Sequence, residues 1–442
     1  MVVGAARSGI AAAELLARRG ARVTLTDTRE RVEGAAALRA HGVALALGGH
    51  TPAMLGQADL VVLSPGVDPL NPVLDQARAQ GVEIIGELEM ASRWVRGPLV
   101  AITGTKGKST TTTLIGRMLA AAGRTVVVGG NIGVPLSSQV DASTEETVHV
   151  VEVSSFQLET TTTFRPSIAV WLNFAADHLD RHPTLQAYAA AKARIFANQQ
   201  PTDWAVVNSE DPEVMTHAAR GAARRLAFAP LGAVVEGFQV DGDWIIRRTS
   251  AGAEAVIPVS AVELSGRHML GNVTAAAAVA SLVEVAPAAM VLALSGFHGL
   301  EHVMEPVAVR GGVRFVNDSK ATNIEAATRS IESFDHGVVA IIGGKFKGGD
   351  FRDLRAALTE RGRAVVAIGE AAPLVRAALA DVLPVVDAGS MPEAVARAYA
   401  AAMVGDVVLL APACASFDWF RDYAARGRAF KDAVTQVEER RS

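Results

Sequence analysis

The stretch AITGTKGKSTTTTL, Ala101 to Leu114, lies between an expected strand and an expected helix. It departs from the usual phosphate-loop pattern G-x-x-x-x-G-K-[ST], because its first glycine is Gly104, two positions late. Gly107, Lys108 and Ser109 keep the rest of the pattern. A tight loop that opens a helix presents free backbone N–H groups and the positive end of the helix dipole, which together hold a phosphate. The alternative for this stretch alone is a glycine turn with a solvated lysine.

Composition limits the classes of protein that this chain can be. With 442 residues, half of them apolar, it is too long for one core and predicts two or three domains. The net charge of -4 and the lack of a dense Lys/Arg run argue against nucleic acid and a polybasic membrane patch as partners. Cys414 is the only cysteine and is expected to be a small buried hydrophobe. The longest apolar run is broken by Glu284 and Pro287, so we expect a soluble, cytoplasmic protein without membrane insertion.

Short β-branched runs alternate with Ala/Leu-rich segments of helical period in three successive blocks, a pattern typical of α/β domains. In the first block we expect strands within 22–27, 59–66 and 82–87 and a helix over 9–20 that ends at Gly20. The second block begins with a strand over 99–103, continues with strands over 148–153, 168–172 and 204–208, and the third begins near residue 299. The prediction is three α/β domains: Rossmann-like over 1–97, P-loop ATPase-like over 98–298 and Rossmann-like over 299–442.

Polar residues follow two of the expected central strands. Glu152 ends an apolar strand, at the edge of the sheet where ligands of open α/β sheets bind, and is a credible Mg²⁺ ligand. The alternative is a glutamate exposed to water at a strand end. A second polar cluster follows Trp171, and its members are Asn173, Asp177, His178, Asp180, Arg181 and His182. On residue type alone, Lys192 on the next helix would be an ordinary surface lysine.

A series of motifs in this order resembles the Mur ligases, the ATP-dependent enzymes that build the peptidoglycan stem peptide. The motifs are GTKGKSTTT, GGNIGVP, EVSSFQLE, DHLDRH followed by YAAAK, NDSKATN, GGKFKGGDF and PACASFDWFRDYAARGRAF. In that family the phosphate loop is G-T-x-G-K-[ST], so the displaced Gly104 is normal there. The resemblance implies that an acyl phosphate forms from ATP and that D-glutamate is then joined to UDP-N-acetylmuramoyl-L-alanine, with release of ADP and phosphate.

The resemblance also assigns the central site. It implies catalytic roles for Lys108, Glu152, His178 and Lys192. Ser109 and Glu152 would hold one Mg²⁺, and His178 would hold a second together with Lys192, carbamylated on its amine. The implied ATP contacts are Gly104, Thr105, Lys106, Gly107, Lys108, Ser109, Thr110, Asn272 and Asp318.

The first domain carries a loop, VVGAARSGI, that resembles a dinucleotide loop, with Asp27 near the position of a ribose-binding acid. Ala6 replaces the middle glycine, so a nicotinamide cofactor is weakly supported. In the ligase family this domain holds the UDP-sugar substrate. The residues implied for that substrate are Arg7, Ser8, Thr28, Arg29, Gly66, Asn131 and His178.

The third domain is expected to hold the amino acid. Its strand ends should bring Lys320, Thr322, Lys347, Ser416 and the backbone near Tyr423 to one edge of a parallel sheet. Two lysines and two hydroxyls suit a small ligand with two carboxylates. The alternative is that both lysines flank glycine turns in solvent. The choice of D-glutamate comes from the resemblance alone.

Two positions depart from the family pattern. Met269 stands where an asparagine is common, and Val303 stands where an arginine is common. Losing an arginine donor near a triphosphate should weaken ATP binding.

Three alternative functions remain open. The first is another amide ligase of the superfamily, adding a different amino acid or resembling folylpolyglutamate synthase. The second is a dehydrogenase built on the loop from Gly4 to Gly9, and the third is a non-catalytic nucleotide-binding protein. Family precedent suggests a monomer.

Overall fold

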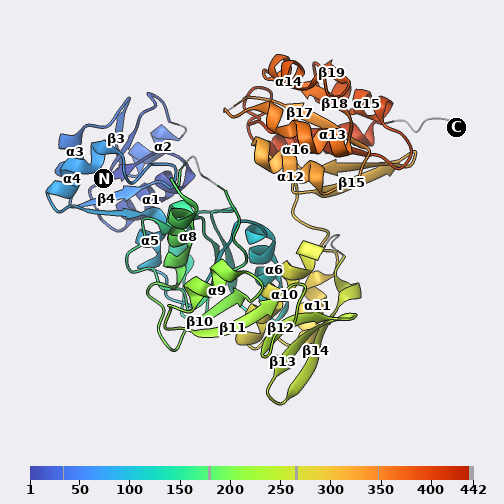
Figure 1. The fold of residues 1–442 in the computed structure, drawn as a ribbon. Helices are drawn as coiled ribbons and strands as arrows, with labels where there is room; N and C mark the ends of the chain where they lie inside the picture. Colours follow the sequence, from blue (N-terminus) through green and yellow to red (C-terminus); the bar gives the residue numbers. More distant parts are fainter. Residues whose placement is uncertain (33, 178–180, 264–266, 347, 438–442) are drawn as a thin grey trace. The chain divides into compact units, whose positions relative to one another are not determined.

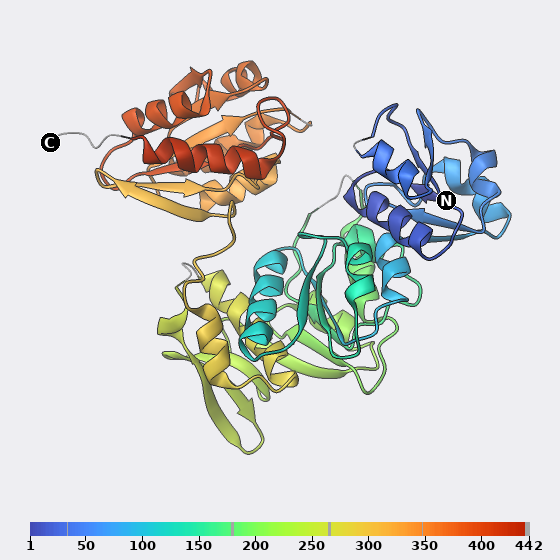
Figure 2. The same ribbon diagram turned by 180° about the vertical axis from the view of Figure 1, so that it is seen from behind.

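A computed structural model describes residues 1–32, 34–177, 181–263, 267–346 and 348–437. The chain forms two compact units, Met1–Phe297 and His298–Ser442, shown from two sides in Figures 1 and 2. The first unit contains two sheets and the second contains one. The fold class is confirmed, because each sheet is mainly parallel and is interleaved with helices. The boundary at residue 97 stays a prediction, since both sheets of the first unit belong to one compact body.

The first sheet is fully parallel, with strand order β3-β2-β1-β4-β5. Its strands are β1 (Val2–Val3), β2 (Thr24–Asp27), β3 (Ala44–Leu47), β4 (Leu60–Leu63) and β5 (Glu83–Gly86). The helices are α1 (Arg7–Arg18), α2 (Ala35–Ala40), α3 (Pro52–Gly56), α4 (Asp75–Ala79) and α5 (Glu87–Ser92), with a 3-10 turn η1 (Pro72–Leu74). Gly20, with φ +85°, follows the end of α1 as predicted. The strand order reverses between β1 and β4, the place where such sheets bind ligands.

The second sheet has the order β14-β13-β12-β11-β10-β9-β6-β8-β7, parallel except for β13 and β14. Its strands are β6 (Leu99–Thr103), β7 (Val126–Gly130), β8 (Val148–Glu152), β9 (Ile168–Trp171), β10 (Trp204–Asn208), β11 (Arg224–Ala229), β12 (Gly237–Asp241), β13 (Trp244–Thr249) and β14 (Gly252–Pro258). The helices are α6 (Lys108–Ala121), α7 (Ser155–Leu158), α8 (Leu185–Ala193), α9 (Pro212–Ala218), α10 (Arg267–Leu282) and α11 (Pro287–Leu294). Short 3-10 turns are η2 (Leu136–Ser138), η3 (Val140–Ala142), η4 (Arg194–Phe196) and η5 (Val259–Ala261). The predicted strands over 99–103 and 204–208 match β6 and β10.

The third sheet, in the second unit, has the order β15-β16-β20-β17-β18-β19, with only β15 antiparallel to its neighbour. Its strands are β15 (Glu305–Arg310), β16 (Val313–Asn317), β17 (Val338–Gly343), β18 (Gly362–Ile368), β19 (Val385–Ala388) and β20 (Val407–Leu410). The helices are α12 (Ile324–Glu332), α13 (Arg355–Arg361), α14 (Ala372–Leu379), α15 (Met391–Ala401) and α16 (Tyr423–Thr435), with the 3-10 turn η6 (Phe351–Leu354).

Continuous apolar runs explain the central strands. Every residue of β6 and of β17 is buried, as expected for parallel strands that helices cover on both faces. Cys414 is also buried, as predicted. Within the described ranges, no helix combines the length and apolarity needed to cross a bilayer.

Helix α5 ties the first sheet to the second. The Glu89 side chain is fully buried, and its carboxylate accepts backbone N–H bonds from Thr162, Thr163 and Phe164. Arg93 adds a bond from Nε at 3.1 Å. Burial alone would raise the pKa of Glu89, but the hydrogen bonds from Thr163 and Thr162 outweigh it and lower the pKa to about 2. A charged carboxylate therefore joins the end of the first sheet to the loop before β9.

Candidate nucleotide and substrate site

The quoted stretch folds as a strand, a tight loop and a helix. Gly104 (φ +154°) and Gly107 (φ +81°) adopt backbone conformations that other residues rarely accept. A Cβ on Gly107 would lie 2.2 Å from Oδ1 of Asn272, and one on Gly104 would lie 3.0 Å from Cβ of Leu172. The displaced glycine is therefore required by the contact with Leu172 at the end of β9.

Asn173 fixes the shape of this loop. Its Oδ1 accepts N–H bonds from Thr105 at 3.1 Å and Lys106 at 2.8 Å, and its Nδ2 donates to the Lys106 carbonyl at 3.1 Å. The Lys108 ammonium folds back and donates to the carbonyls of Gly104 (2.9 Å) and Thr105 (3.0 Å). The loop is thus preorganised, with a cation beside its backbone amides.

Ser109, Glu152 and Asn131 meet at the carboxyl edge of the central sheet. Ser109 Oγ donates to Glu152 Oε2 at 2.6 Å, and Asn131 Nδ2 donates to Glu152 Oε1 at 2.7 Å. Glu152 is only 2% exposed, so the alternative of a glutamate in open water is wrong. The structure therefore pairs two residues predicted to hold Mg²⁺ and adds Asn131 from the loop after β7.

Lys192 is buried (1% exposed), so an ordinary surface lysine is the wrong interpretation. Its ammonium donates to the Gly104 carbonyl at 2.8 Å and lies 4.6 Å from the centre of the Tyr188 ring. Burial, with the nearby charge of Lys108, lowers the pKa of Lys192 well below its usual value, against the opposing effect of Asp177 and Glu152.

Sequence reasoning missed Tyr188 as a neighbour of Lys192. The two residues are four positions apart on α8 and therefore share a helix face, which was a usable signal.

The oxygen donors at this edge fit Mg²⁺. A hydroxyl and a carboxylate are hard ligands, and Mg²⁺ sites commonly combine one or two protein oxygens with phosphate oxygens and water. Within the described ranges, no three His, Cys, Asp or Glu side chains are grouped as metal ligands.

The polar cluster after β9 is only partly described. His178 and Asp180 lie outside the described residues. His182 is 4% exposed, and its Nε2 lies 3.0 Å from Ser155 Oγ. This buried contact joins the loop after β9 to the start of α7. Arg181 donates to the Val67 carbonyl at 3.2 Å and thereby joins the central sheet to the loop after β4.

Five of the seven residues predicted for the UDP-sugar follow the carboxyl ends of strands in the first sheet. Arg7 and Ser8 begin α1 directly after β1, and Arg7 donates to the Gly133 carbonyl at 2.9 Å. Thr28 and Arg29 follow β2, and Gly66 follows β4, all exposed. The remaining two predicted residues come from the central sheet: Asn131 after β7, and His178, which lies outside the described residues. The five residues from the first sheet share one edge of that sheet.

Asp27 does not offer a free carboxylate to a ribose. It accepts N–H bonds from Ala5 at 2.6 Å and from Arg29 side-chain nitrogens at 2.9 Å. Its hydrogen bonds to Arg29 hold the pKa of Asp27 far below the usual range. Asp27 is therefore engaged within the protein, while the dehydrogenase alternative itself is based on the loop from Gly4 to Gly9.

In the second unit, three loops meet at the carboxyl edge of the third sheet. Ala413 donates to the Ala321 carbonyl at 2.9 Å, and Lys345 donates to the Ala415 carbonyl at 2.8 Å. The loops after β16, β17 and β20 are therefore joined. They carry four of the predicted residues: Lys320 and Thr322, which are half-buried, Ser416, which is buried, and Tyr423, which is exposed. Lys347 lies outside the described residues.

Arg426, on α16, supports these loops and was missed in the sequence. It is 1% exposed and donates to the carbonyls of Ser319 (2.9 Å) and Cys414 (3.0 Å). Burial lowers the pKa of Arg426 to about 10. Asp318, predicted to contact ATP, is also buried, and burial raises the pKa of its carboxyl. No pattern in the sequence distinguishes Arg426 from Arg428, the other arginine of this helix.

Met269 and Val303 are the two positions that depart from the family pattern. Asn272 Nδ2 lies 3.6 Å from the Met269 sulfur, a weak contact at the position where the family commonly has asparagine. Val303 is half-buried and precedes Met304, whose backbone N–H donates to Asp318 at 3.2 Å.

Comparison with known proteins covers all three sheets. Family models match residues 1–86 (Mur ligase MurD-like, N-terminal domain), 102–280 (Mur ligase middle domain) and 304–414 (Mur ligase, glutamate ligase domain). The chain belongs to the Mur ligase family. It is 45% identical over 439 residues to a UDP-N-acetylmuramoylalanine--D-glutamate ligase of Acidobacterium capsulatum, with 98% of this chain and 95% of that protein covered. An enzyme of the same name from Anaeromyxobacter dehalogenans is 45% identical, with 98% and 97% covered.

Solved structures of Mur ligases have the same fold. UDP-N-acetylmuramate-alanine ligase MurC from Thermotoga maritima matches with a TM-score of 0.59 at 19% identity, covering 99% of both chains. MurF ligase from Thermotoga maritima, in complex with ADP, matches with a TM-score of 0.56 at 17% identity, covering 95% of this chain and 90% of that one. At these identities the likeness concerns the fold alone.

Proposed function

We propose that this Mur ligase joins D-glutamate to UDP-N-acetylmuramoyl-L-alanine at the expense of ATP, in peptidoglycan biosynthesis. The observation that carries the proposal is the Ser109–Glu152 contact beside the phosphate loop. This contact occurs in a chain that matches D-glutamate ligases over nearly its full length. A cytoplasmic monomer is part of the same proposal, and its support is family precedent.

The reaction has two steps in this proposal. A carboxylate oxygen of UDP-N-acetylmuramoyl-L-alanine attacks the γ-phosphorus of ATP, the bond to ADP breaks, and an acyl phosphate forms. The D-glutamate amine then attacks the acyl carbon, phosphate leaves with the bonding electrons, and the nitrogen loses a proton. Lys108 and the backbone N–H groups of the loop hold the phosphates and stabilise their negative charge.

Ser109 and Glu152 would hold Mg²⁺, which supplies positive charge beside the transferring phosphoryl group. Lys192 is proposed to be carbamylated: its neutral amine attacks carbon dioxide, forms an N–C bond and loses a proton. A lowered pKa supports this role, because only the neutral amine is nucleophilic. His178 completes the proposed second metal position.

The other two ligands are assigned by sheet edge. The UDP-sugar is assigned to Arg7, Ser8, Thr28, Arg29 and Gly66 of the first sheet, with Asn131 and His178 from the central sheet. D-Glutamate is assigned to Lys320, Thr322, Lys347, Ser416 and Tyr423 of the third sheet.

The test is an ADP-release assay with UDP-N-acetylmuramoyl-L-alanine and a panel of amino acids. We expect release to depend on both the sugar nucleotide and D-glutamate. Equal use of L-glutamate would contradict the assignment, as would a preference for a basic or apolar amino acid. Activity with a folate and glutamate would favour the folylpolyglutamate synthase-like alternative.

A further inference from the structure

A cationic pocket lies on the opposite side of the first unit from the phosphate loop. It has a volume of about 710 Å³ and lies between the C-terminal end of α1, the segment before β6 and the turn η3. Arg18 follows the start of α1 by eleven residues, or about 16 Å along the helix axis. Because β6 and β8 begin here, the pocket is at the amino ends of strands whose carboxyl ends carry Gly104 and Glu152.

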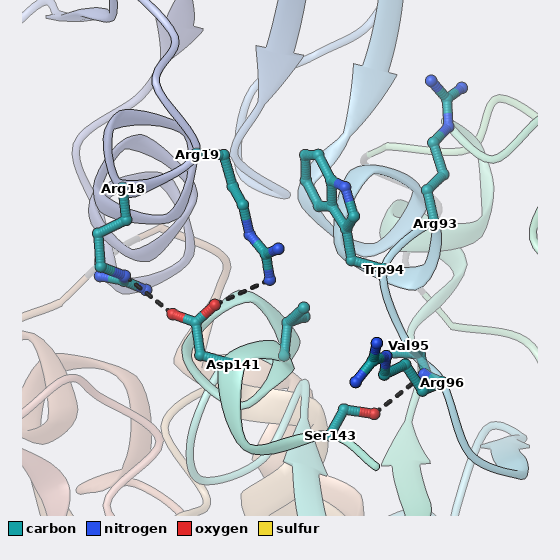
Figure 3. Close-up of a pocket in the computed structure, with 9 residues that line it drawn as sticks. Arg18, Arg19, Arg93, Trp94, Val95, Arg96, Asp141 and Ser143 are labelled. Atoms are coloured by element: carbon teal, nitrogen blue, oxygen red, sulfur yellow. Dashed lines mark hydrogen bonds and ion pairs between the residues drawn. The ribbon is translucent and has the colours of Figure 1, made fainter. Parts of the chain in front are cut away.

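Three guanidinium groups and one carboxylate define the charge of this pocket. Arg18 Nε and Arg19 Nη2 each lie 2.9 Å from an Asp141 oxygen, and Figure 3 shows both side chains turned toward that carboxylate. A guanidinium has five N–H donors, so each of these arginines retains several for a ligand. The Arg93 guanidinium points away from Asp141 in Figure 3. It donates instead to Glu83 at 2.6 Å and to Glu89 at 3.1 Å.

Arg96 supplies the third cation. Its backbone N–H donates to Ser143 Oγ at 3.0 Å, but within the described part of the chain its side chain has no hydrogen bond or ion pair. Trp94 lines the same pocket, with the Arg19 guanidinium carbon 5.7 Å from its ring centre. The pocket therefore has an excess of two positive charges beside an aromatic ring.

We propose that this pocket binds a small anion with two linked phosphate groups. Arginine donors arranged in forks match phosphate oxygens, and two linked phosphates offer enough oxygens to accept bonds from Arg18, Arg19 and Arg96, which lie on two separate segments. A bound ligand would join α1 of the first sheet to the segment leading into the central sheet. The site is separate from the phosphate loop and does not depend on the reaction proposed above.

The test uses inorganic pyrophosphate in titration calorimetry with the full-length Lys108→Ala protein, which weakens binding at the phosphate loop. With the proposed UDP-sugar site filled by saturating UDP-N-acetylmuramoyl-L-alanine, we expect one remaining binding event. Adding Arg96→Gln should weaken it about tenfold, because one charge-assisted contact is lost. Adding Asp141→Asn should tighten it several-fold, because a competing carboxylate is removed. Arg225→Gln, an exposed arginine on β11, is the matched control and should change nothing.

Two results would overturn the site: no pyrophosphate binding to the Lys108→Ala protein, or binding that Arg96→Gln and Asp141→Asn leave unchanged. Thermal unfolding checks that each variant folds, and Arg18→Gln replaces Arg96→Gln if the latter does not. ADP and UDP distinguish the source of the phosphates. If ADP and UDP bind with the same affinity as pyrophosphate, the pocket recognises the diphosphate alone. If they bind more tightly, and Trp94→Leu removes that gain, the base also contributes to binding.

Discussion

At the scale of single residues, Lys108 and Lys192 share the Gly104 carbonyl as acceptor, at 2.9 and 2.8 Å. Lys108→Ala should abolish ADP release, because Lys108 is the side-chain cation that the phosphate loop is proposed to supply to the ATP phosphates. The affinity for the UDP-sugar, measured by calorimetry, should stay nearly unchanged, because that ligand is assigned to another sheet. A comparable loss of both quantities would contradict the assignment of ligands to separate sheets.

The second residue-scale prediction concerns Lys192. Lys192→Ala should be inactive, and a short carboxylate such as acetate added to the assay should restore part of the rate. The reason is that the added carboxylate replaces the oxygens of the proposed carbamate. Full activity without acetate would sink the proposal. Tyr188→Phe, which keeps the ring beside Lys192, is the control and should keep most of the activity.

At the scale of elements, α5 should make stability depend on pH through Glu89. The pKa of Glu89 is lowered to about 2 from a usual 4.5. The ionised carboxylate therefore stabilises the folded protein fully above about pH 4.5. That stabilisation is lost as the pH falls from 4.5 toward 2. Glu89→Gln should cost about 2 kcal/mol at neutral pH, because buried donors lose a charged acceptor.

Urea unfolding of both proteins between pH 3 and 7 measures this effect. The difference in unfolding free energy between wild type and Glu89→Gln should shrink as the pH falls. A difference that stays constant with pH would show that the carboxylate charge is not the cause. Glu83→Gln, at an exposed partner of Arg93, is the control and should change stability little.

At the scale of the whole molecule, each ligand is assigned to a different sheet, so substitutions should separate by substrate. Thr322→Ala and Ser416→Ala in the second unit should raise the KM for D-glutamate about tenfold, the value of a lost charge-assisted hydrogen bond. The KM for ATP should change much less. Initial rates with each substrate varied in turn give both values. Ser333→Ala, an exposed serine that only caps its own helix, is the control, and a larger effect on ATP than on D-glutamate would reverse the assignment.

Local sequence determined the elements and their class. Strand β6, which is fully buried, and strand β10, which is buried except for Trp204, were predicted with the bounds that the structure has, because continuous apolar runs between helical segments have few alternative structures. The phosphate loop was also recognisable, since Gly107, Lys108 and Ser109 are adjacent in the chain. The carboxyl edge of each sheet then followed from strand direction alone.

Tertiary structure decided the environment of each side chain. Lysine is a residue type usually found on the protein surface, but the packing of α8 against the phosphate loop buries Lys192 and lowers its pKa. The pairing of Glu89 with the loop at Thr162, and of Arg18 and Arg19 with Asp141, joins residues more than 70 positions apart. Burial and long-range hydrogen bonds depend on which surfaces meet in the folded chain, and no local pattern of residue types encodes that.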